Sequence, residues 1–154
     1  TNRTWDSGKS AILMLAYPPF KEGQRVAPQE IITLVSFLLD KGADVNDEDF
    51  HGETPLALAS LHKEPDLARF LLDRGANPNT SNSSGTTPLM YAAQANRVET
   101  TRILLEYGAD RGAKDIYGDT ALDHVRKWIR GWGSTEREQS KKEAYQEMIE
   151  LFGE

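Results

Sequence analysis

The 154-residue sequence contains no cysteine. Disulfide bonds, thiolate nucleophiles and cysteine-ligated metal sites are therefore excluded, and we expect a reducing compartment, cytoplasmic or nuclear. Long apolar runs are also missing. The longest, residues 11–17, ends at Pro18-Pro19, far short of the roughly 18 residues that a membrane span needs. We expect no secretion signal and no membrane association.

An excess of basic residues is missing as well. The chain carries 18 Lys and Arg against 24 Asp and Glu, for a net charge of −6. Nucleic-acid binding needs a basic face, so we expect no nucleic-acid partner, and the acidic balance favours a partner with a basic segment. The hydrophobic fraction of 38% and mean hydropathy of −0.57 are low for one globular core. Stacked layers that bury only their neighbours tolerate such values.

Motifs for chemistry are absent too. The three histidines, His51, His62 and His124, do not pair at the spacing of metal ligands on a helix. Gly8-Lys9-Ser10 ends like a phosphate-binding loop, but the glycine required at position 3 is Arg3. No nucleophile elbow is recognisable. We expect no enzyme activity, no catalytic residue, no metal and no cofactor.

What the sequence does contain is a repeat. The phrase Leu-Leu-x-x-Gly-Ala occurs three times, with its glycines at Gly42, Gly75 and Gly108, each 33 residues after the last. Thr-Pro-Leu at 54–56 and 87–89, and Thr-Ala-Leu at 120–122, keep the same period. Two phrases locked to one period of this length predict a stack of repeated units.

Each phrase also predicts local structure. Thr54 is suited to cap a helix whose first residue is Pro55, and Gly75 is suited to end the second helix in a left-handed conformation. Gly52, Gly85 and Gly118 precede each threonine and suit a positive φ at a tight turn. The unit is therefore a turn, a short helix, a loop, a second helix and a glycine stop, and the fold class is all-α.

The period and both phrases resemble the ankyrin repeat, at residues 52–59 and 71–79 and again at 85–92 and 104–110. The resemblance covers roughly residues 4–125 well and the rest loosely. The resemblance implies one ankyrin solenoid over residues 1–154, of about four helix-turn-helix repeats at about 4–45, 46–78, 79–111 and 112–154. The histidine usual in the family after Thr-Pro-Leu is replaced by Ala57, Met90 and Asp123. This puts the usual hydrogen bonding at that position in doubt.

Both terminal repeats are longer than the inner ones, and we interpret them as modified caps. From turn glycine to stop glycine the inner repeats span 23 residues, but Gly8 to Gly42 spans 34 and Gly118 to Gly153 spans 35. The excess of 11 residues falls near 17–28, and that of 12 near 128–136. A closing helix over about 135–152 carries one apolar face, with Ala144, Tyr145, Met148, Ile149 and Phe152.

Ankyrin domains bind partners on the concave face, built from hairpin tips and first helices. By resemblance we expect a protein or peptide partner, a chain that is monomeric alone, and binding residues Phe50, His51, Glu53, Leu61, His62, Thr86, Met90, Gln94, Tyr117, Asp119, Asp123, Lys127 and Trp128. Two alternatives stay open. One is a chaperone or inhibitor subunit that shields a basic segment of its client with the acidic hairpin residues Asp44, Asp47, Glu48 and Asp49. The other is a regulatory fragment of a larger enzyme, or an active site within the inserted loops.

Overall fold

A computed structural model of the chain describes residues 11–16, 27–130 and 145–153, and these residues are helical or irregular, without strands. Residues 145–151 form the last helical turns. The other helices are α1 (Ala11–Ala16), α2 (Pro28–Asp40), α3 (Pro55–Leu61), α4 (Pro65–Asp73), α5 (Pro88–Gln94), α6 (Val98–Glu106) and α7 (Ala121–Arg130). The all-helical fold predicted from the repeat is confirmed.

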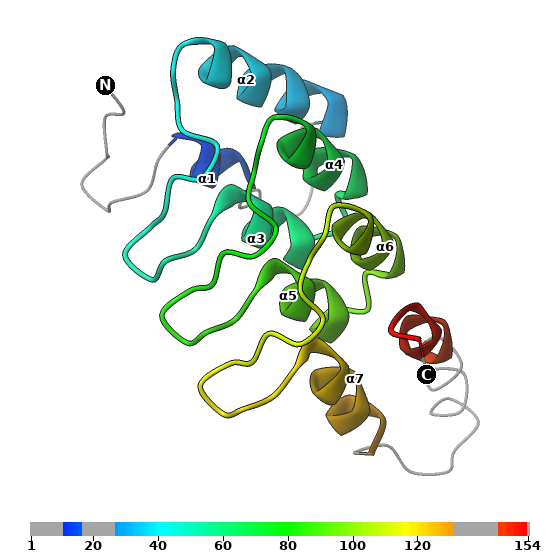
Figure 1. Cartoon of the computed structure of the whole chain (residues 1–154). Coiled ribbons are helices and arrows are strands. Elements are labelled where there is room, and N and C mark those ends of the chain that lie inside the picture. The colour runs from blue at the N-terminus through cyan, green and yellow to red at the C-terminus, as the bar shows by residue number, and fades with distance from the viewer. Residues whose placement is uncertain (1–10, 17–26, 131–144, 154) are drawn as a thin grey trace.

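The helices form two rows, with hairpins projecting from one side (Figure 1). The inner row is α1, α3, α5 and α7, in which each helix packs on the next, and the outer row is α2, α4 and α6. Within a repeat, the inner helix packs on the outer one. Among α1 to α7, only helices of the same or adjacent repeats share large contacts, which is the arrangement of a solenoid.

The Thr-Pro phrases begin the inner helices as predicted. The hydroxyl of Thr54 accepts a hydrogen bond from the N–H of Ala57 at 3.2 Å, with Pro55 in the first helical position. Thr87 does the same with the N–H of Met90 at 3.3 Å. A hydroxyl that satisfies a free helical N–H stabilises a helix start by about 1 kcal/mol.

The glycine stops also behave as predicted. Gly75 has a φ of +88°, and its N–H donates to the carbonyl of Leu72 at 3.0 Å. The N–H of Ala76 donates to the carbonyl of Leu71, also at 3.0 Å. These two bonds satisfy carbonyls at the end of α4, and the same pattern recurs after Gly42 and Gly108.

The core runs between the two rows through every layer. Most of its large, fully buried side chains are Leu, Ile and Met residues from inner and outer helices, among them Leu56, Leu71, Leu89, Met90, Ile103 and Leu104. Small residues such as Ala59 and Ala92, both 0% exposed, let neighbouring inner helices approach closely. Each layer thus contributes one slice of a continuous core.

The two ends of the stack differ. At the C-terminal end, Tyr145, Met148 and Phe152 are buried against the core, as expected of a capping helix, and the Tyr145 hydroxyl donates to the carbonyl of Gln94 at 3.2 Å.

At the N-terminal end, α1 and α2 leave an apolar surface exposed. Eleven residues separate α1 from α2, against three between α3 and α4. Residues 17–26, most of the predicted first insertion, and 131–136 of the second lie outside the described residues, as do the early part of the closing helix and Ala144.

Candidate partner-binding face

Three hairpins are built from one recurring side-chain contact. Asp49, Asn82 and Asp115 hold the same position in successive repeats, 33 residues apart. In each, Oδ1 accepts the backbone N–H groups of the residues two and four positions later, at 2.8 to 3.0 Å. A short polar side chain that satisfies two backbone donors fixes the shape of a tight turn.

Glycine allows the hairpins to pack against each other. Gly52 and Gly85 have φ values of +75° and +73°. A Cβ atom on Gly85 would lie 3.0 Å from Cα of Asp115, and one on Gly52 would lie 3.2 Å from Cα of Asn82. Any side chain at either glycine would push the neighbouring hairpin away.

Backbone hydrogen bonds then join the tips into one ladder. The N–H of Ser83 donates to the carbonyl of His51 at 2.8 Å, and the N–H of Ile116 donates to the carbonyl of Ser84 at 3.0 Å. The hairpin between α2 and α3 is thus bonded to the next hairpin, and that hairpin to the last one (Figure 1). Side chains on the three tips keep fixed spacings as a result.

Large apolar side chains stand on the first and last tips. Phe50 is 76% exposed, Ile116 64% and Tyr117 79%. The middle tip carries only Ser83 and Ser84 at the matching positions. We name this surface, from Phe50 and His51 across the serines to Ile116 and Tyr117, the hairpin face. Folding does not need exposed aromatics, whereas binding surfaces use them as anchors.

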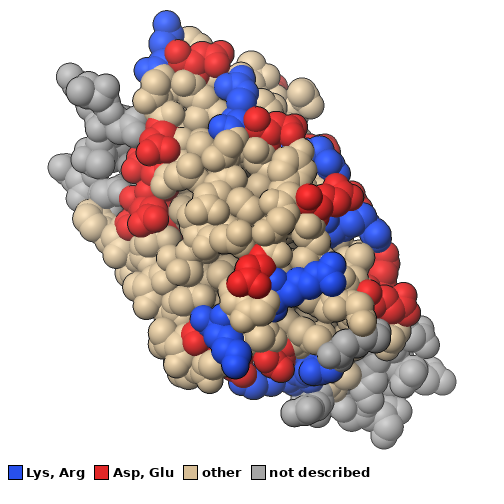
Figure 2. All heavy atoms as spheres, viewed as in Figure 1, with Lys and Arg blue, Asp and Glu red and all other residues tan. Residues whose placement is uncertain are grey.

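Acidic side chains also lie near the first hairpin, and among the described residues Figure 2 shows no Lys or Arg directly beside them on this face. Most of them serve the turn. Oδ1 of Asp44 accepts the N–H of Asn46 at 2.8 Å, and Oδ1 of Asp47 accepts the N–H of the next residue at 3.1 Å. Oδ1 of Asp49 accepts two further N–H groups. Glu48 is exposed. Most carboxylates of this hairpin therefore stabilise its turns.

The inner helices contribute fewer accessible residues than expected. Leu61, His62 and Gln94 are half-buried, and Lys127 is exposed. Burial, and next the positive charge of Arg97, lower the pKa of His62. Thr86 and Asp119 are half-buried beside the hairpins. Trp128 is in α7, and its side chain lies outside the described part.

Met90 does not lie on the surface, and its assignment to the partner-binding set is wrong. The side chain is 0% exposed and belongs to the main core. Its sulfur accepts the N–H of Thr87 at 3.4 Å. The reason is packing: the residue after Thr-Pro-Leu turns toward the neighbouring inner helix, as Ala57 does at 4% exposure.

Glu53, Asn82 and Tyr91 form a hydrogen-bond cluster between two repeats. The Tyr91 hydroxyl donates to Oε1 of Glu53, and Nδ2 of Asn82 donates to the same oxygen at 2.7 Å and to the Tyr91 hydroxyl at 3.0 Å. Burial and the hydrogen bond to Glu53 raise the pKa of Tyr91. Glu53, expected to contact a partner, is thus already engaged within the stack.

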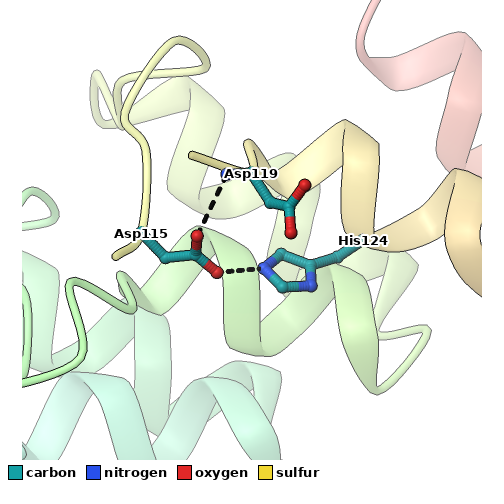
Figure 3. A group of neighbouring side chains, drawn as sticks. All are labelled: Asp115, Asp119 and His124. Atoms are coloured by element: carbon teal, nitrogen blue, oxygen red, sulfur yellow. Dashed lines mark hydrogen bonds and ion pairs between the residues drawn. The ribbon is translucent and has the colours of Figure 1, made fainter. Parts of the chain in front are cut away.

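The last repeat contains a related cluster of other residues, which lies within one repeat rather than between two (Figure 3). His124 lies with Nε2 2.9 Å from Oδ2 of Asp115, and the Lys127 ammonium pairs with Asp119. Burial alone would raise the pKa of Asp115, but hydrogen bonds from the backbone of Asp119 and Tyr117, and from His124, lower it. Asp115 and His124 occupy the positions of Asn82 and Tyr91, which is the signal that sequence reasoning missed.

Ligand atoms of Asp115, Asp119 and His124 lie within 4.8 Å of one another, as metal ligands would. Each carboxylate nevertheless has partners of its own, because Oδ1 of Asp115 holds the turn and Asp119 pairs with Lys127. The arrangement joins α7 to its hairpin. We assign it a structural role.

Comparison with known families agrees with this architecture. The family model described as ankyrin repeats (many copies) matches residues 38–89 and, in an overlapping placement, 71–125. The chain belongs to the ankyrin-repeat family. No curated protein matches the ankyrin chain. Ankyrin repeats are protein-binding modules and typically non-catalytic, and no enzyme family was found.

The departures of this ankyrin protein from the family pattern now have an explanation. At the position where a histidine is usual, Oδ2 of Asp123 accepts the N–H of Thr120 at 3.0 Å and its hydroxyl at 2.7 Å. These hydrogen bonds lower the pKa of Asp123. The side chain of Asp123 therefore stabilises the start of α7 by accepting hydrogen bonds from Thr120, whereas Ala57 and Met90 are buried in the core. Among the described residues, no helix of the ankyrin chain is both long and apolar enough to cross a membrane.

Proposed function

We propose that the chain is a non-catalytic interaction module that binds a protein or peptide segment across the hairpin face. The observation that carries this proposal is the set of exposed apolar anchors, Phe50, Ile116 and Tyr117, on tips that are hydrogen-bonded into one ladder. A surface that is already ordered loses little entropy on binding.

The shape of the face favours an extended partner. Ser83 and Ser84 lie between bulky residues on both sides. A partner side chain placed over the serines would contact Phe50 on one flank and Ile116 or Tyr117 on the other. Apolar or aromatic partner residues suit these contacts, and a neighbouring basic residue suits exposed Glu48.

Peptide selection tests the proposal directly. A phage-displayed library of random peptides is selected against the full chain, and the affinities of selected peptides are measured by fluorescence anisotropy. We expect the Phe50→Ala/Tyr117→Ala variant to bind at least about tenfold more weakly, since anchors contribute more than 1 kcal/mol each. The thermal midpoint should stay unchanged, because both side chains are exposed.

A matched control uses another exposed aromatic. Tyr107 follows α6, away from the hairpins, and is 37% exposed. Tyr107→Ala should keep wild-type affinity for the peptides. Equal binding by the double variant, or a fall in its thermal midpoint of several degrees, would contradict the proposal.

A further inference from the structure

The N-terminal end of the stack presents a second apolar surface, on α1 and α2 rather than on the hairpin tips (Figure 1). A groove of about 420 Å³ lies between α1 and α2, lined by Ala11, Met14, Leu15, Leu34, Phe37 and Leu38. Phe37 is 57% exposed, Leu34 47% and Met14 46%. Large apolar side chains grouped in this way mark an interaction site.

The 33-residue register shows what kind of surface this is. Leu34 and Phe37 of α2 correspond to Leu67 and Phe70 of α4. Leu67 is only 3% exposed and Phe70 is packed on the core. The guanidinium of Arg74 lies 5.0 Å from the centre of the Phe70 ring and pairs with α2, so this side of α4 faces α2. The exposed side of α2 is therefore the half of a helix–helix interface for which the described residues supply no second helix.

The exposed apolar stripe of α2 has a charged residue at each end, and these charges indicate which partner would fit it. Glu30, Leu34, Phe37 and Lys41 are spaced 4, 3 and 4 residues apart, so they lie along one side of the helix. All four are exposed. The Nζ of Lys41 lies 5.5 Å from the centre of the Phe37 ring, over the stripe. The stripe thus has a negative end, an apolar middle and a positive end.

This pattern is complementary to itself. The midpoint between Glu30 and Lys41 is the same point in the sequence as the midpoint between Leu34 and Phe37. A two-fold axis through that point would pair Glu30 of one copy with Lys41 of the other, and Leu34 with Phe37. Both pairs would form twice, as an isologous interface requires.

In the next repeat, the residue equivalent to Lys41 makes an ion pair with the neighbouring outer helix. This residue is Arg74, which reaches across the interface from α4 to α2. There its guanidinium lies 3.2 Å from Oδ1 of Asp40 and donates to the hydroxyl of Ser36 at 2.7 Å. A cation at this position therefore crosses to an acidic partner in the adjacent layer. In a second copy, Glu30 would supply the acid.

We propose that the exposed stripe of α2, with Met14 of α1 beside it, docks the same stripe of a second copy in an antiparallel, two-fold dimer. This departs from the monomer expected from the sequence, and it is independent of the proposed function of the hairpin face. The stripe is small compared with standard interfaces of about 800 Å² per partner, so the dimer is weak, with a dissociation constant on the order of 100 µM.

Charge reversal tests the axis. Sedimentation equilibrium of the full chain from about 10 µM to 1 mM should show a monomer–dimer equilibrium. Glu30→Lys places like charges opposite each other at both ends and should weaken the dimer at least about tenfold. Lys41→Glu should do the same. An equimolar mixture of the two variants should recover dimers, because the two introduced side chains then face each other with opposite charge. At the other end of that mixed dimer, the unchanged Lys41 of one copy faces the unchanged Glu30 of the other.

The matched control reverses a charge elsewhere. Asp66 is exposed in the first turn of α4, so Asp66→Lys carries the same cost at a helix start as Glu30→Lys, but away from the stripe. It should dimerise like the wild type, and circular dichroism verifies that all variants are folded. A wild-type chain that stays monomeric at about 1 mM, or a mixture that does not recover dimers, would overturn the proposal. So would a partner helix from another protein that binds the stripe while the chain alone never self-associates.

Cysteine cross-linking adds a geometric test, since the native chain has no cysteine. Positions 30 and 41 are about 16.5 Å apart along the helix, at 1.5 Å per residue. A disulfide needs Cα atoms within about 7 Å. Under mild oxidation, mixed Glu30→Cys and Lys41→Cys chains should give covalent dimers, whereas either variant alone should not. Equal cross-linking of the single variants would rule out the antiparallel register.

Discussion

The imidazole of His124 lies with Nε2 2.9 Å from Oδ2 of Asp115, which joins the last inner helix to the tip of the last hairpin. The other oxygen of Asp115 accepts two backbone N–H groups of the turn. One carboxylate therefore fixes the hairpin and its position on α7. The equivalent residue of the preceding repeat, Asn82, makes the corresponding contacts with an amide. Asp115→Asn is therefore a substitution that the fold already accommodates at this position of the repeat.

Asp115→Asn should change the pH dependence of stability more than stability itself. The pKa of Asp115 is lowered in the folded state, so its contribution is full above about pH 4 and is lost as the pH falls through the folded pKa. The amide keeps the turn bonds but does not titrate. Urea unfolding from pH 7 to pH 2.5 should show a shallower acid-side loss for the variant.

Asp115→Ala is the contrasting variant, since it removes the turn acceptor as well. Two N–H groups lose their partner, and the stability at pH 7 should fall by about 2 kcal/mol. Equal acid-side slopes for wild type and Asp115→Asn would contradict the assignment of the titrating group.

Two buried threonines should respond in opposite ways to the same substitution. Thr101 is 0% exposed, and its hydroxyl has no hydrogen-bond partner within the described residues. Thr101→Val replaces that hydroxyl with a methyl group of similar size, so stability should rise by about 1 kcal/mol. Thermal or urea unfolding measures the change.

Thr87→Val is the control, because this hydroxyl caps α5. Its loss should lower stability by about 1 kcal/mol. If both variants shift in the same direction, the difference in hydrogen bonding between the two hydroxyls is not what determines their contribution.

Asn79 should be required for the connection between adjacent repeats. Its Oδ1 accepts the N–H of Asp110 at 2.7 Å, and its Nδ2 donates to the carbonyl of Gly108 at 3.1 Å. Asn46 makes the same pair of bonds to the repeat that follows it. Asn79→Ala should cost about 1 kcal/mol, and amide exchange should increase first at Asp110.

Asn79→Asp separates the two bonds, since it keeps the acceptor and loses the donor. Its stability should fall between those of the wild type and Asn79→Ala. A variant no better than alanine would assign the whole effect to the bond with Gly108.

Binding to the hairpin face should depend weakly on salt. The proposed anchors are apolar, and most carboxylates of the first hairpin already hold its turn. Raising the salt concentration from about 50 to about 500 mM should change the affinity of a selected peptide less than about threefold. A steep decrease would favour the alternative in which the acidic hairpin shields a basic segment.

The repeat phrases predicted the fold because each of their residues has a local reason to be there. A threonine before proline starts a helix, and a glycine at the left-handed position stops one, whatever surrounds them. Met90 shows where such local reasoning fails. Its exposure depends on which way the start of α5 faces in the stack, and that is set by the packing of the neighbouring layers.

Register comparison could have recovered part of what was missed. Ala57, one period before Met90, is a small apolar residue, which is typical of a buried position. Asn82 with Tyr91 and Asp115 with His124 repeat one spacing of nine residues. The stripe of α2 was equally visible in the sequence, but only the structure shows that it lies uncovered at the end of the stack.

Hydrogen bonding between neighbouring hairpins has a mechanical consequence. Each hairpin tip is joined to the next by a backbone hydrogen bond. The side chains of Asn46 and Asn79 each join one repeat to the following one. Tension applied along the stack would load these links in series, so the weakest layer yields first and its neighbours keep their shape. The protein would then lengthen in discrete steps, with one repeat unfolding at each step.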